Sequence, residues 1–256
     1  MRALVTGAGG RLGAAMAIEL ARLGHDVAIH FASSCNGAED TAEAVASEGR
    51  TGVPVQADLL DLDACEALVD RAAGVLGGPL NVLVNNASIF EYDDIHTASR
   101  ETWDRHIGSN LRAPLILTQA FAAQAPAVAS DGAPLASGCI VNMIDQRVRK
   151  LTPEFMTYTL AKSALWTLTR TTARALAPAI RVNAIGPGPT LKGSRQSAEH
   201  FAAQRAATVL GRGSDTDDVV GALRYIIGAK AVTGQLICVD GGQHLAWQTP
   251  DVIGRE

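Results

Sequence analysis

The chain has 256 residues, of which 47% are hydrophobic and 19% charged, and its formal net charge is −4. This balance is typical of a folded globular protein and gives no electrostatic reason to expect nucleic acid or an anionic membrane as a partner. The four cysteines are widely scattered and the six histidines show no metal-ligand spacing, so neither a disulfide framework nor a metal site is predicted.

The first residues run directly into an apolar segment, which leaves no room for a signal peptide. No stretch of about 18 apolar residues is present that would span a bilayer. We therefore expect a cytoplasmic protein without membrane contact.

Strands and helices are predicted to alternate along the chain. Seven short apolar runs predict strands, at residues 3–7, 26–31, 52–58, 80–86, 138–143, 181–185 and 236–239. Apolar positions that recur three and four residues apart predict helices between them, most clearly at 12–23, 65–75 and 157–176. This alternation predicts an α/β fold with a parallel, doubly wound sheet and helices on both faces.

The organisation into domains is predicted to be simple. No linker rich in proline, glycine and serine divides the chain, and no internal repeat is visible. Residues 123–137 have a loop-like composition but join a helix to the next strand, so we interpret them as a surface loop. We expect one domain, residues 1–256.

A glycine-rich turn follows the first predicted strand and opens the first helix. It runs from Thr6 through Gly7, Gly9, Gly10, Arg11 and Leu12 to Gly13. Glycines let backbone N–H groups approach a pyrophosphate, and the helix N-terminus favours its negative charge. The position between a strand and a helix is the context that a dinucleotide-binding turn requires.

The end of the second predicted strand indicates which nicotinamide cofactor is bound. An acidic residue there would bind the ribose hydroxyls of NAD, but none occurs before Glu39. Ser33 and Ser34 offer donors to a 2′-phosphate, and Arg11 adds a cation to the same region. The sequence therefore favours NADP.

Tyr158 and Lys162 are the candidate proton-transfer pair. Residues four apart share one face of a helix, and a nearby cation favours the phenolate, so we expect a lowered tyrosine pKa. Taken alone, such a pair also occurs on many solvated helices.

These features, in this order, resemble the short-chain dehydrogenases/reductases over essentially the whole chain. The matching segments are the glycine loop at 6–13, Asp58-Leu59, Asn85-Asn86-Ala87, Asn110, Tyr158-x-x-x-Lys162 and Pro187-Gly188. The resemblance implies a single-domain Rossmann fold with a seven-stranded sheet, a nicotinamide cofactor and a homotetramer.

The resemblance also implies roles for individual residues. Tyr158 would be the general acid, Lys162 would lower its pKa and hold the nicotinamide ribose, and Asn110 would anchor a water relay. Asp58 would flank the adenine; for both Asn110 and Asp58 simple capping of a helix or turn is the alternative. With the glycine loop and the serine pair, the expected cofactor contacts are Gly7, Arg11, Leu12, Ser33, Ser34, Asp58, Leu59, Asn86, Ala87, Ser88, Lys162, Pro187 and Gly188.

Two departures from the common family pattern narrow the resemblance. Arg11 replaces the third glycine of the loop, and Asp145 replaces the serine thirteen residues before the tyrosine. With the segment 85–90 they resemble the pteridine reductases and their bacterial dihydromonapterin and dihydrofolate reductase relatives. That branch implies that Arg11 and Ser88 contact the substrate and that Phe90 stacks on its ring; ordinary core packing is the alternative for Phe90.

Asp145 bears directly on the substrate. An ionised carboxylate only accepts hydrogen bonds and repels the oxyanion that develops when a ketone is reduced. A pterin instead presents N–H donors and a C=N bond whose nitrogen needs a proton, which a carboxylate can share with Tyr158. The alternative is a site that has lost its activity.

We therefore predict an NADPH-dependent reductase that converts 7,8-dihydropterins to tetrahydropterins. Its expected substrate contacts are Arg11, Ser88, Phe90, Asp145 and Tyr158. Dihydrofolate is a further candidate if the cleft admits its glutamate tail, and the basic run 147–150 is either a contact for that tail or a solvated loop. Two alternatives stay open: a carbonyl or 3-oxoacyl-type reductase in which water replaces the serine, and a nucleotide-sensing module without turnover.

Overall fold

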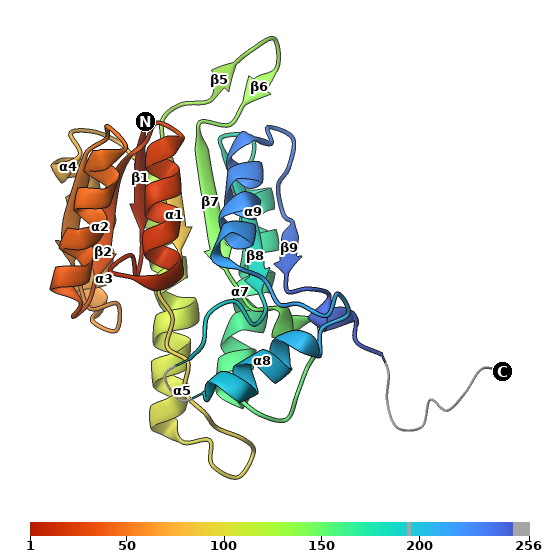
Figure 1. Cartoon of the computed structure of the whole chain (residues 1–256). Helices are drawn as coiled ribbons and strands as arrows, with labels where there is room; N and C mark the ends of the chain where they lie inside the picture. Colours follow the sequence, from red (N-terminus) through yellow and green to blue (C-terminus); the bar gives the residue numbers. More distant parts are fainter. Residues whose placement is uncertain (194–195, 248–256) are drawn as a thin grey trace.

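The computed structural model describes residues 1–193 and 196–247 and contains one large parallel sheet (Figure 1). Its seven strands have the order β3-β2-β1-β4-β7-β8-β9. They are β1 (Arg2–Val5), β2 (Asp26–Phe31), β3 (Gly52–Gln56), β4 (Val82–Asn85), β7 (Gly138–Met143), β8 (Ile180–Pro187) and β9 (Leu236–Val239). The predicted doubly wound α/β fold is confirmed.

Helices cover both faces of the sheet. One face carries α1 (Arg11–Arg22), α2 (Cys35–Ser47) and α9 (Thr216–Gly228), and the other carries α3 (Leu62–Glu66), α4 (Leu68–Val75), α6 (Ala113–Gln124) and α7 (Met156–Ala175). Two more helices, α5 (Arg100–Ile107) and α8 (Ala198–Ala206), lie beyond the end of the sheet to which the strand arrows point (Figure 1). In the described part of the chain, no helix is long and apolar enough to cross a membrane.

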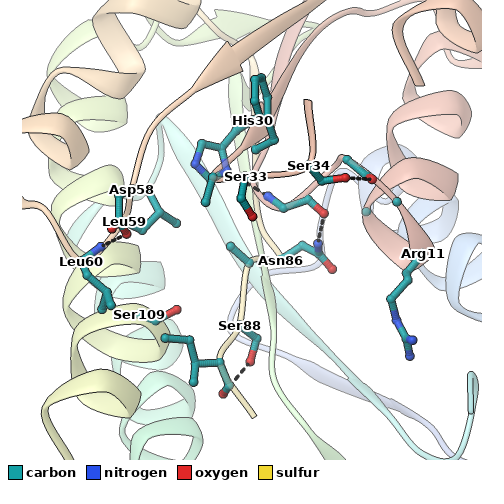
Figure 2. Close-up of a pocket in the computed structure, with 18 of the residues that line it drawn as sticks. Arg11, His30, Ser33, Ser34, Asp58, Leu59, Leu60, Asn86, Ser88 and Ser109 are labelled. Carbon is teal, nitrogen blue, oxygen red and sulfur yellow. Dashed lines mark hydrogen bonds between the residues drawn. The ribbon is translucent and has the colours of Figure 1, made fainter. Parts of the chain in front are cut away.

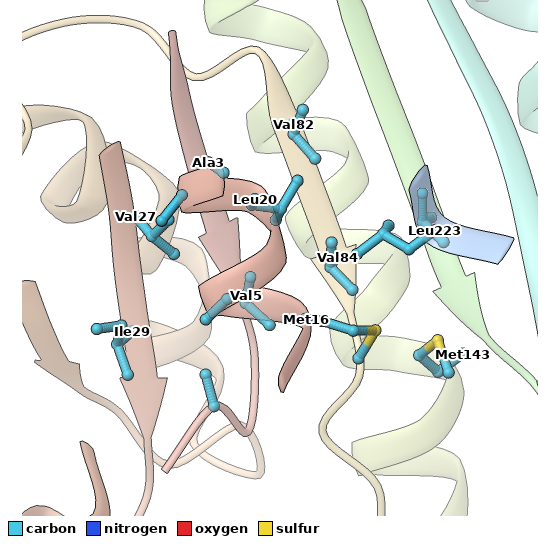
Figure 3. Packing of buried hydrophobic residues seen from close by; sticks show 14 of the residues in the cluster. Ala3, Val5, Met16, Leu20, Val27, Ile29, Val82, Val84, Met143 and Leu223 are labelled. Carbon is cyan, nitrogen blue, oxygen red and sulfur yellow. The ribbon is translucent and has the colours of Figure 1, made fainter. Parts of the chain in front are cut away.

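The core consists of apolar layers between the sheet and its helices. On the α1 face, Met16 and Leu20 pack against strand residues that include Val5 and Val84 (Figure 3). Leu117 and Phe121 of α6 belong to the corresponding layer on the opposite face. Burial of apolar side chains on both faces explains why the strand sequences are continuously apolar rather than alternating.

The order of the strands determines where the site lies. The chain moves from β1 outward to β2 and β3, and then returns to place β4 on the other side of β1. At such a reversal the loops after the two central strands diverge and leave a crevice at their carboxyl ends. The glycine loop after β1 and the segment after β4 border this crevice.

Several local predictions differ from the structure, and three of the differences concern a helix, a turn and a loop. The predicted helix 65–75 is two helices, α3 and α4, which meet at Ala67. The predicted strand 3–7 ends at Val5, because Gly7 has φ +63° and turns the chain. The expected loop 123–137 contains a short antiparallel hairpin, β5 (Ala129–Ser130) and β6 (Pro134–Leu135), at the end of the sheet opposite α5 and α8 (Figure 1).

Candidate active site

The glycine loop is shaped by close backbone contacts. A Cβ atom at Gly13 would lie 2.2 Å from the carbonyl oxygen of Gly7, so no larger residue fits there without movement of the loop. Gly7 adopts a left-handed conformation, φ +63°, which glycine tolerates at little cost. These glycines let the N-terminus of α1 approach the loop closely, as binding of a pyrophosphate requires.

His30 holds the loop from the end of β2. The N–H of Gly7 donates to its Nδ1 at 3.0 Å, so the ring proton is on Nε2, which donates to the carbonyl of Ala57 at 3.1 Å. Burial lowers the pKa of His30 to about 4, which keeps the ring neutral and able to accept. Sequence reasoning missed this residue; its only signal was a polar side chain inside an apolar strand.

A cleft of about 970 Å³ extends from the glycine loop across the ends of β2 and β4 (Figure 2). Ten of the residues predicted to contact the cofactor line it: Gly7, Arg11, Leu12, Ser33, Ser34, Asp58, Leu59, Asn86, Ala87 and Ser88. Its size and length along the carboxyl edge fit an extended dinucleotide.

Some of these side chains are already engaged. Ser34 donates its hydroxyl to the carbonyl of Gly9 at 3.1 Å, and Asp58 accepts the N–H of Leu60 at 2.9 Å. The turn-capping alternative for Asp58 is therefore observed, although the residue also lines the cleft. Ser33 and Ser34 directly precede α2, whose N-terminus favours a phosphate.

Arg11 directs its guanidinium to the segment after β8 and forms no hydrogen bond with Ser33 or Ser34 among the described residues. It has φ +52°, a left-handed conformation that is unfavourable for a residue with a Cβ atom. Its guanidinium donates to the carbonyls of Leu191 and Lys192 at 3.4 and 3.3 Å. Arg11 lines both the large cleft and the smaller one described next, so it connects the two.

The smaller cleft, of about 270 Å³, adjoins the first and contains the candidate catalytic residues. It is lined by Arg11, Leu12, Asn86, Ser88, Phe90, Met143, Ile144, Asp145, Tyr158, Lys162, Pro187, Gly188, Thr190 and Leu191. All five predicted substrate contacts are in this set. Thr190, which sequence reasoning did not identify, bonds the hydroxyl of Ser214.

Tyr158 and Asp145 form a hydrogen-bonded pair at the base of this cleft. The tyrosine hydroxyl donates to Asp145 Oδ2 at 3.2 Å, and Oδ1 accepts the backbone N–H of Arg147 at 2.8 Å. Burial raises the pKa of the Asp145 carboxyl. Burial, together with the charge of Asp145, raises the pKa of the Tyr158 hydroxyl well above 10.

The expectation that Lys162 lowers the tyrosine pKa is wrong for this structure. Lys162 donates to the carbonyl of Met143 at 2.7 Å and is 2% exposed. Burial lowers the pKa of Lys162 to about 8. Burial and then the charge of Asp145 therefore determine the pKa of the tyrosine, and burial shifts the pKa of both the phenol and the carboxyl upward.

Phe90 forms one wall of the small cleft. Its ring stacks on Phe155 with centroids 4.4 Å apart and an angle of 9°, and meets Tyr158 edge-on at 4.7 Å. The side chain is 44% exposed, which contradicts the alternative of ordinary core packing. Phe155, which the sequence did not reveal, has φ +55° and carries the guanidinium of Arg147 5.0 Å from its ring centroid.

Asn110 lies behind the clefts and lines neither of them. It is fully buried in a π-helix, Gly108–Arg112, and holds the backbone of Ile89 from both sides. The N–H of Ile89 donates to Asn110 Oδ1 at 2.9 Å, and Nδ2 donates to the Ile89 carbonyl at 2.8 Å. Asn110 thus fixes the segment that carries Ser88 and Phe90, and its side chain does not cap a helix.

Comparison with known proteins identifies the family. Residues 7–244 match the family model described as enoyl-(acyl carrier protein) reductase. The chain belongs to the short-chain dehydrogenase/reductase family. It is an NAD(P)-dependent oxidoreductase of that family, as the order of motifs predicted.

Individual relatives cover almost the entire chain. FolM, alternative dihydrofolate reductase 1 of Brucella suis, solved in complex with NADP, is 43% identical with a TM-score of 0.91, and the match covers 98% of each chain. An uncharacterized oxidoreductase of Methylorubrum extorquens is 34% identical over 94% of this chain and 96% of its own. A 3-oxoacyl-[acyl-carrier-protein] reductase of Staphylococcus aureus is 29% identical over 95% of this chain and 98% of its own.

The comparisons bear on the predicted cofactor, and the structure bears on the metal. The NADP of the Brucella complex agrees with the cofactor predicted from the serine pair. Within residues 1–193 and 196–247, no three His, Cys, Asp or Glu side chains are grouped so that they would hold a metal ion.

Proposed function

We propose that this protein is an NADPH-dependent reductase of pterins, which converts 7,8-dihydropterins to tetrahydropterins and accepts dihydrofolate as a further candidate substrate. The observation that carries the proposal is the carboxyl group of Asp145 within 3.2 Å of the Tyr158 hydroxyl. The name of the Brucella protein, an alternative dihydrofolate reductase, supports the same substrate class.

The residues present fit a bound NADPH. The turn at Gly7 and the close approach of Gly13 leave the N-terminus of α1 accessible to a pyrophosphate. Lys162, Pro187 and Gly188 line the part of the cleft next to Tyr158, where a nicotinamide ring would lie. NADPH supplies the hydride that is added to the carbon of the C=N bond.

The chain's own residues supply the proton that the nitrogen of this bond receives. The raised pKa of Tyr158 keeps its hydroxyl protonated near neutral pH, and burial raises the pKa of Asp145 as well. Tyr158 can give its proton to the ring nitrogen, and a proton from solvent then restores the hydrogen-bonded pair of Tyr158 and Asp145. A positioned acid of this kind contributes about 10²- to 10⁴-fold to the rate.

The walls of the small cleft suit a flat ring that carries hydrogen-bond donors. Phe90 presents an exposed aromatic side chain held parallel to Phe155, and stacking of this type contributes about 0.5–1.5 kcal/mol. Ser88 and Arg11 line the same cleft and offer polar contacts. A ketone would use none of the accepting capacity of Asp145.

The direct test is oxidation of NADPH by the purified protein with a panel of substrates. The panel contains dihydrobiopterin, dihydromonapterin, dihydrofolate, a 3-oxoacyl thioester and simple ketones. We expect turnover with the dihydropterins and little with the ketones. Turnover with the 3-oxoacyl thioester or ketones alone would favour a carbonyl or 3-oxoacyl-type reductase, and the Staphylococcus relative is named as a 3-oxoacyl-[acyl-carrier-protein] reductase. Tight NADPH binding without turnover would favour a nucleotide-sensing module.

We further propose that residues 1–256 act as one domain, in the cytoplasm, within a homotetramer. The proposal of a tetramer follows from the resemblance to the family. Light scattering coupled to size-exclusion chromatography measures the mass directly, and a monomer at micromolar concentration would contradict it.

A further inference from the structure

A buried polar network adjoins the catalytic tyrosine but takes no part in the proton transfer described above. Its members are Asp93, from the segment after β4, His106 at the end of α5, and Thr157, the second residue of α7. All three are at most 3% exposed. Burial of so many polar groups is unfavourable unless each finds a partner.

Helix α7 needs a partner at its N-terminus. Its first N–H groups have no acceptor within the helix, and the preceding residue, Phe155, has a left-handed conformation and no side-chain cap. Asp93 supplies the missing acceptors from 64 residues away. Its Oδ1 accepts the N–H of Thr157 at 3.2 Å, Oδ2 accepts the Thr157 hydroxyl, and its carbonyl accepts the N–H of Met156 at 3.3 Å.

His106 fixes the direction of the hydrogen bonds. The backbone N–H of Glu91 donates to His106 Nε2 at 3.1 Å, so the proton of the neutral ring is on Nδ1. Nδ1 lies 2.6 Å from the Thr157 hydroxyl and donates to it. The Thr157 proton is then available only to Asp93, and one arrangement of protons satisfies every group.

The network connects two parts of the site whose relative position matters for the reaction. The segment with Asp93 also carries Ser88 and Phe90, whereas Thr157 directly precedes Tyr158 in α7. The ring of His106 additionally meets the ring of Tyr158 edge-on, with centroids 6.0 Å apart. A displacement of Thr157 would move the Tyr158 phenol relative to Phe90, which forms one wall of the small cleft.

We propose that Thr157, held between His106 and Asp93, is a positioning residue that sets the Tyr158 hydroxyl at its reacting distance from the substrate. It lines neither cleft and acts through Tyr158. The inference rests on the proposed role of Tyr158 as the acid, but not on the identity of the substrate.

The test compares Thr157→Val, which keeps the shape and removes the hydroxyl, with Thr157→Ser, which keeps the hydroxyl. Hydride transfer is measured in single-turnover experiments with whichever substrate of the panel the wild-type protein reduces, and NADPH affinity is measured in parallel. We expect Thr157→Val to slow the step about 30-fold, because displacement of a reacting group by 1 Å costs up to about 10²-fold. NADPH affinity should change less than about twofold, and Thr157→Ser should retain at least about a third of the rate.

Three further variants distinguish positioning from general damage to α7. Thr172→Val removes a hydroxyl that bonds only backbone carbonyls of the same helix, and it should leave the rate nearly unchanged. If Thr157→Val does not fold, His106→Asn, which retains a donor in place of Nδ1, is compared with His106→Leu, and only the leucine variant should be slow. A folded Thr157→Val with a rate within about threefold of wild type would overturn the proposal, as would equal losses in the valine and serine variants. Absence of turnover with every dihydropterin would instead overturn the proposed function. The Thr157 variants would then be compared with the substrate of the panel that the wild-type protein does reduce.

Discussion

The large cleft and the small cleft next to it are stabilised in different ways. Around the large cleft, backbone groups and neutral side chains bind one another, as in the contact between Gly7 and His30. Around the small cleft, the buried Tyr158 and Lys162 lie with the partly buried Asp145, and burial shifts the pKa of each toward its neutral form: Asp145 and Tyr158 upward, Lys162 downward. Only the second arrangement costs stability at neutral pH.

This difference separates two tasks. The large cleft needs shape and N–H donors to hold a cofactor, which a well-packed backbone provides without buried charge. Under the proposed function the small cleft must move a proton, so it holds titratable groups together despite the cost of burying them. Substitutions in the first region should therefore change affinity, and substitutions in the second should change the rate.

Tyr158→Phe should have the largest effect. It removes the proton donor and keeps the ring against Phe90, so we expect the rate of hydride transfer to fall about 10³-fold while NADPH affinity changes less than about twofold. Stopped-flow absorbance and fluorescence titration measure the two quantities. Retention of more than a tenth of the rate would remove the tyrosine from the mechanism.

Gly13→Ala should have the opposite effect: it should weaken NADPH binding and leave the rate of hydride transfer nearly unchanged. The new Cβ atom would lie 2.2 Å from the Gly7 carbonyl oxygen, and moving the loop should weaken NADPH binding by about 3 kcal/mol, or roughly 150-fold. At saturating NADPH the single-turnover rate should stay within about threefold of wild type. Gly74→Ala, in α4 with open space around the new methyl group, is the matched control and should bind NADPH normally. A loss of rate at saturation as large as that of Tyr158→Phe would show that the two regions are not separable.

Asp145→Ser tests the substrate preference. A hydroxyl at this position can donate to a carbonyl oxygen, whereas the carboxyl pairs with the donors of a pterin. We expect the ratio of kcat/KM for dihydropterin to kcat/KM for a ketone to fall about 50-fold, measured side by side with NADPH saturating. An unchanged ratio would mean that Asp145 does not select the substrate.

The sequence predicted the large cleft better than the small one. Glycines and strand ends are local signals, so the ten predicted residues that line the large cleft were found from motifs alone. His30 was missed because its role depends on Gly7 and Ala57, which are distant in the sequence and meet only in the folded sheet.

In the small cleft the sequence identified residue types but not their electrostatic balance. The spacing of Tyr158 and Lys162 predicted a shared face, yet whether the lysine or Asp145 dominates the phenol depends on burial and on the Met143 carbonyl that the lysine binds. Phe155 was missed for a similar reason, since nothing local indicates a left-handed residue before α7. Local patterns specify which groups are present, and three-dimensional packing sets their energies.

Lys162→Met should change stability by less free energy than the changes expected above, and this change should have the clearest pH dependence. The pKa of Lys162 is lowered from 10.5 to about 8 by burial, so between these values the unfolded chain binds a proton that the folded chain lacks, and wild-type stability should rise with pH. Below pH 8 the buried charge of Lys162 lowers the stability of the wild-type protein by roughly 3 kcal/mol, which the methionine variant recovers. The variant also loses the hydrogen bond to the Met143 carbonyl, which reduces this gain by about 1 kcal/mol. At pH 7 the variant should therefore be more stable than wild type by about 2 kcal/mol in urea denaturation, even though it loses activity.

The control for this last variant is Lys230→Met, which removes an exposed ion pair with Asp131. Such a pair contributes less than about 1 kcal/mol, and its loss should leave the rise in stability between pH 8 and 10.5 intact. The same rise in Lys162→Met would place its origin elsewhere in the chain. If the rise in stability disappears in Lys162→Met but not in Lys230→Met, the cost of buried charge lies in the small cleft and not in the large one.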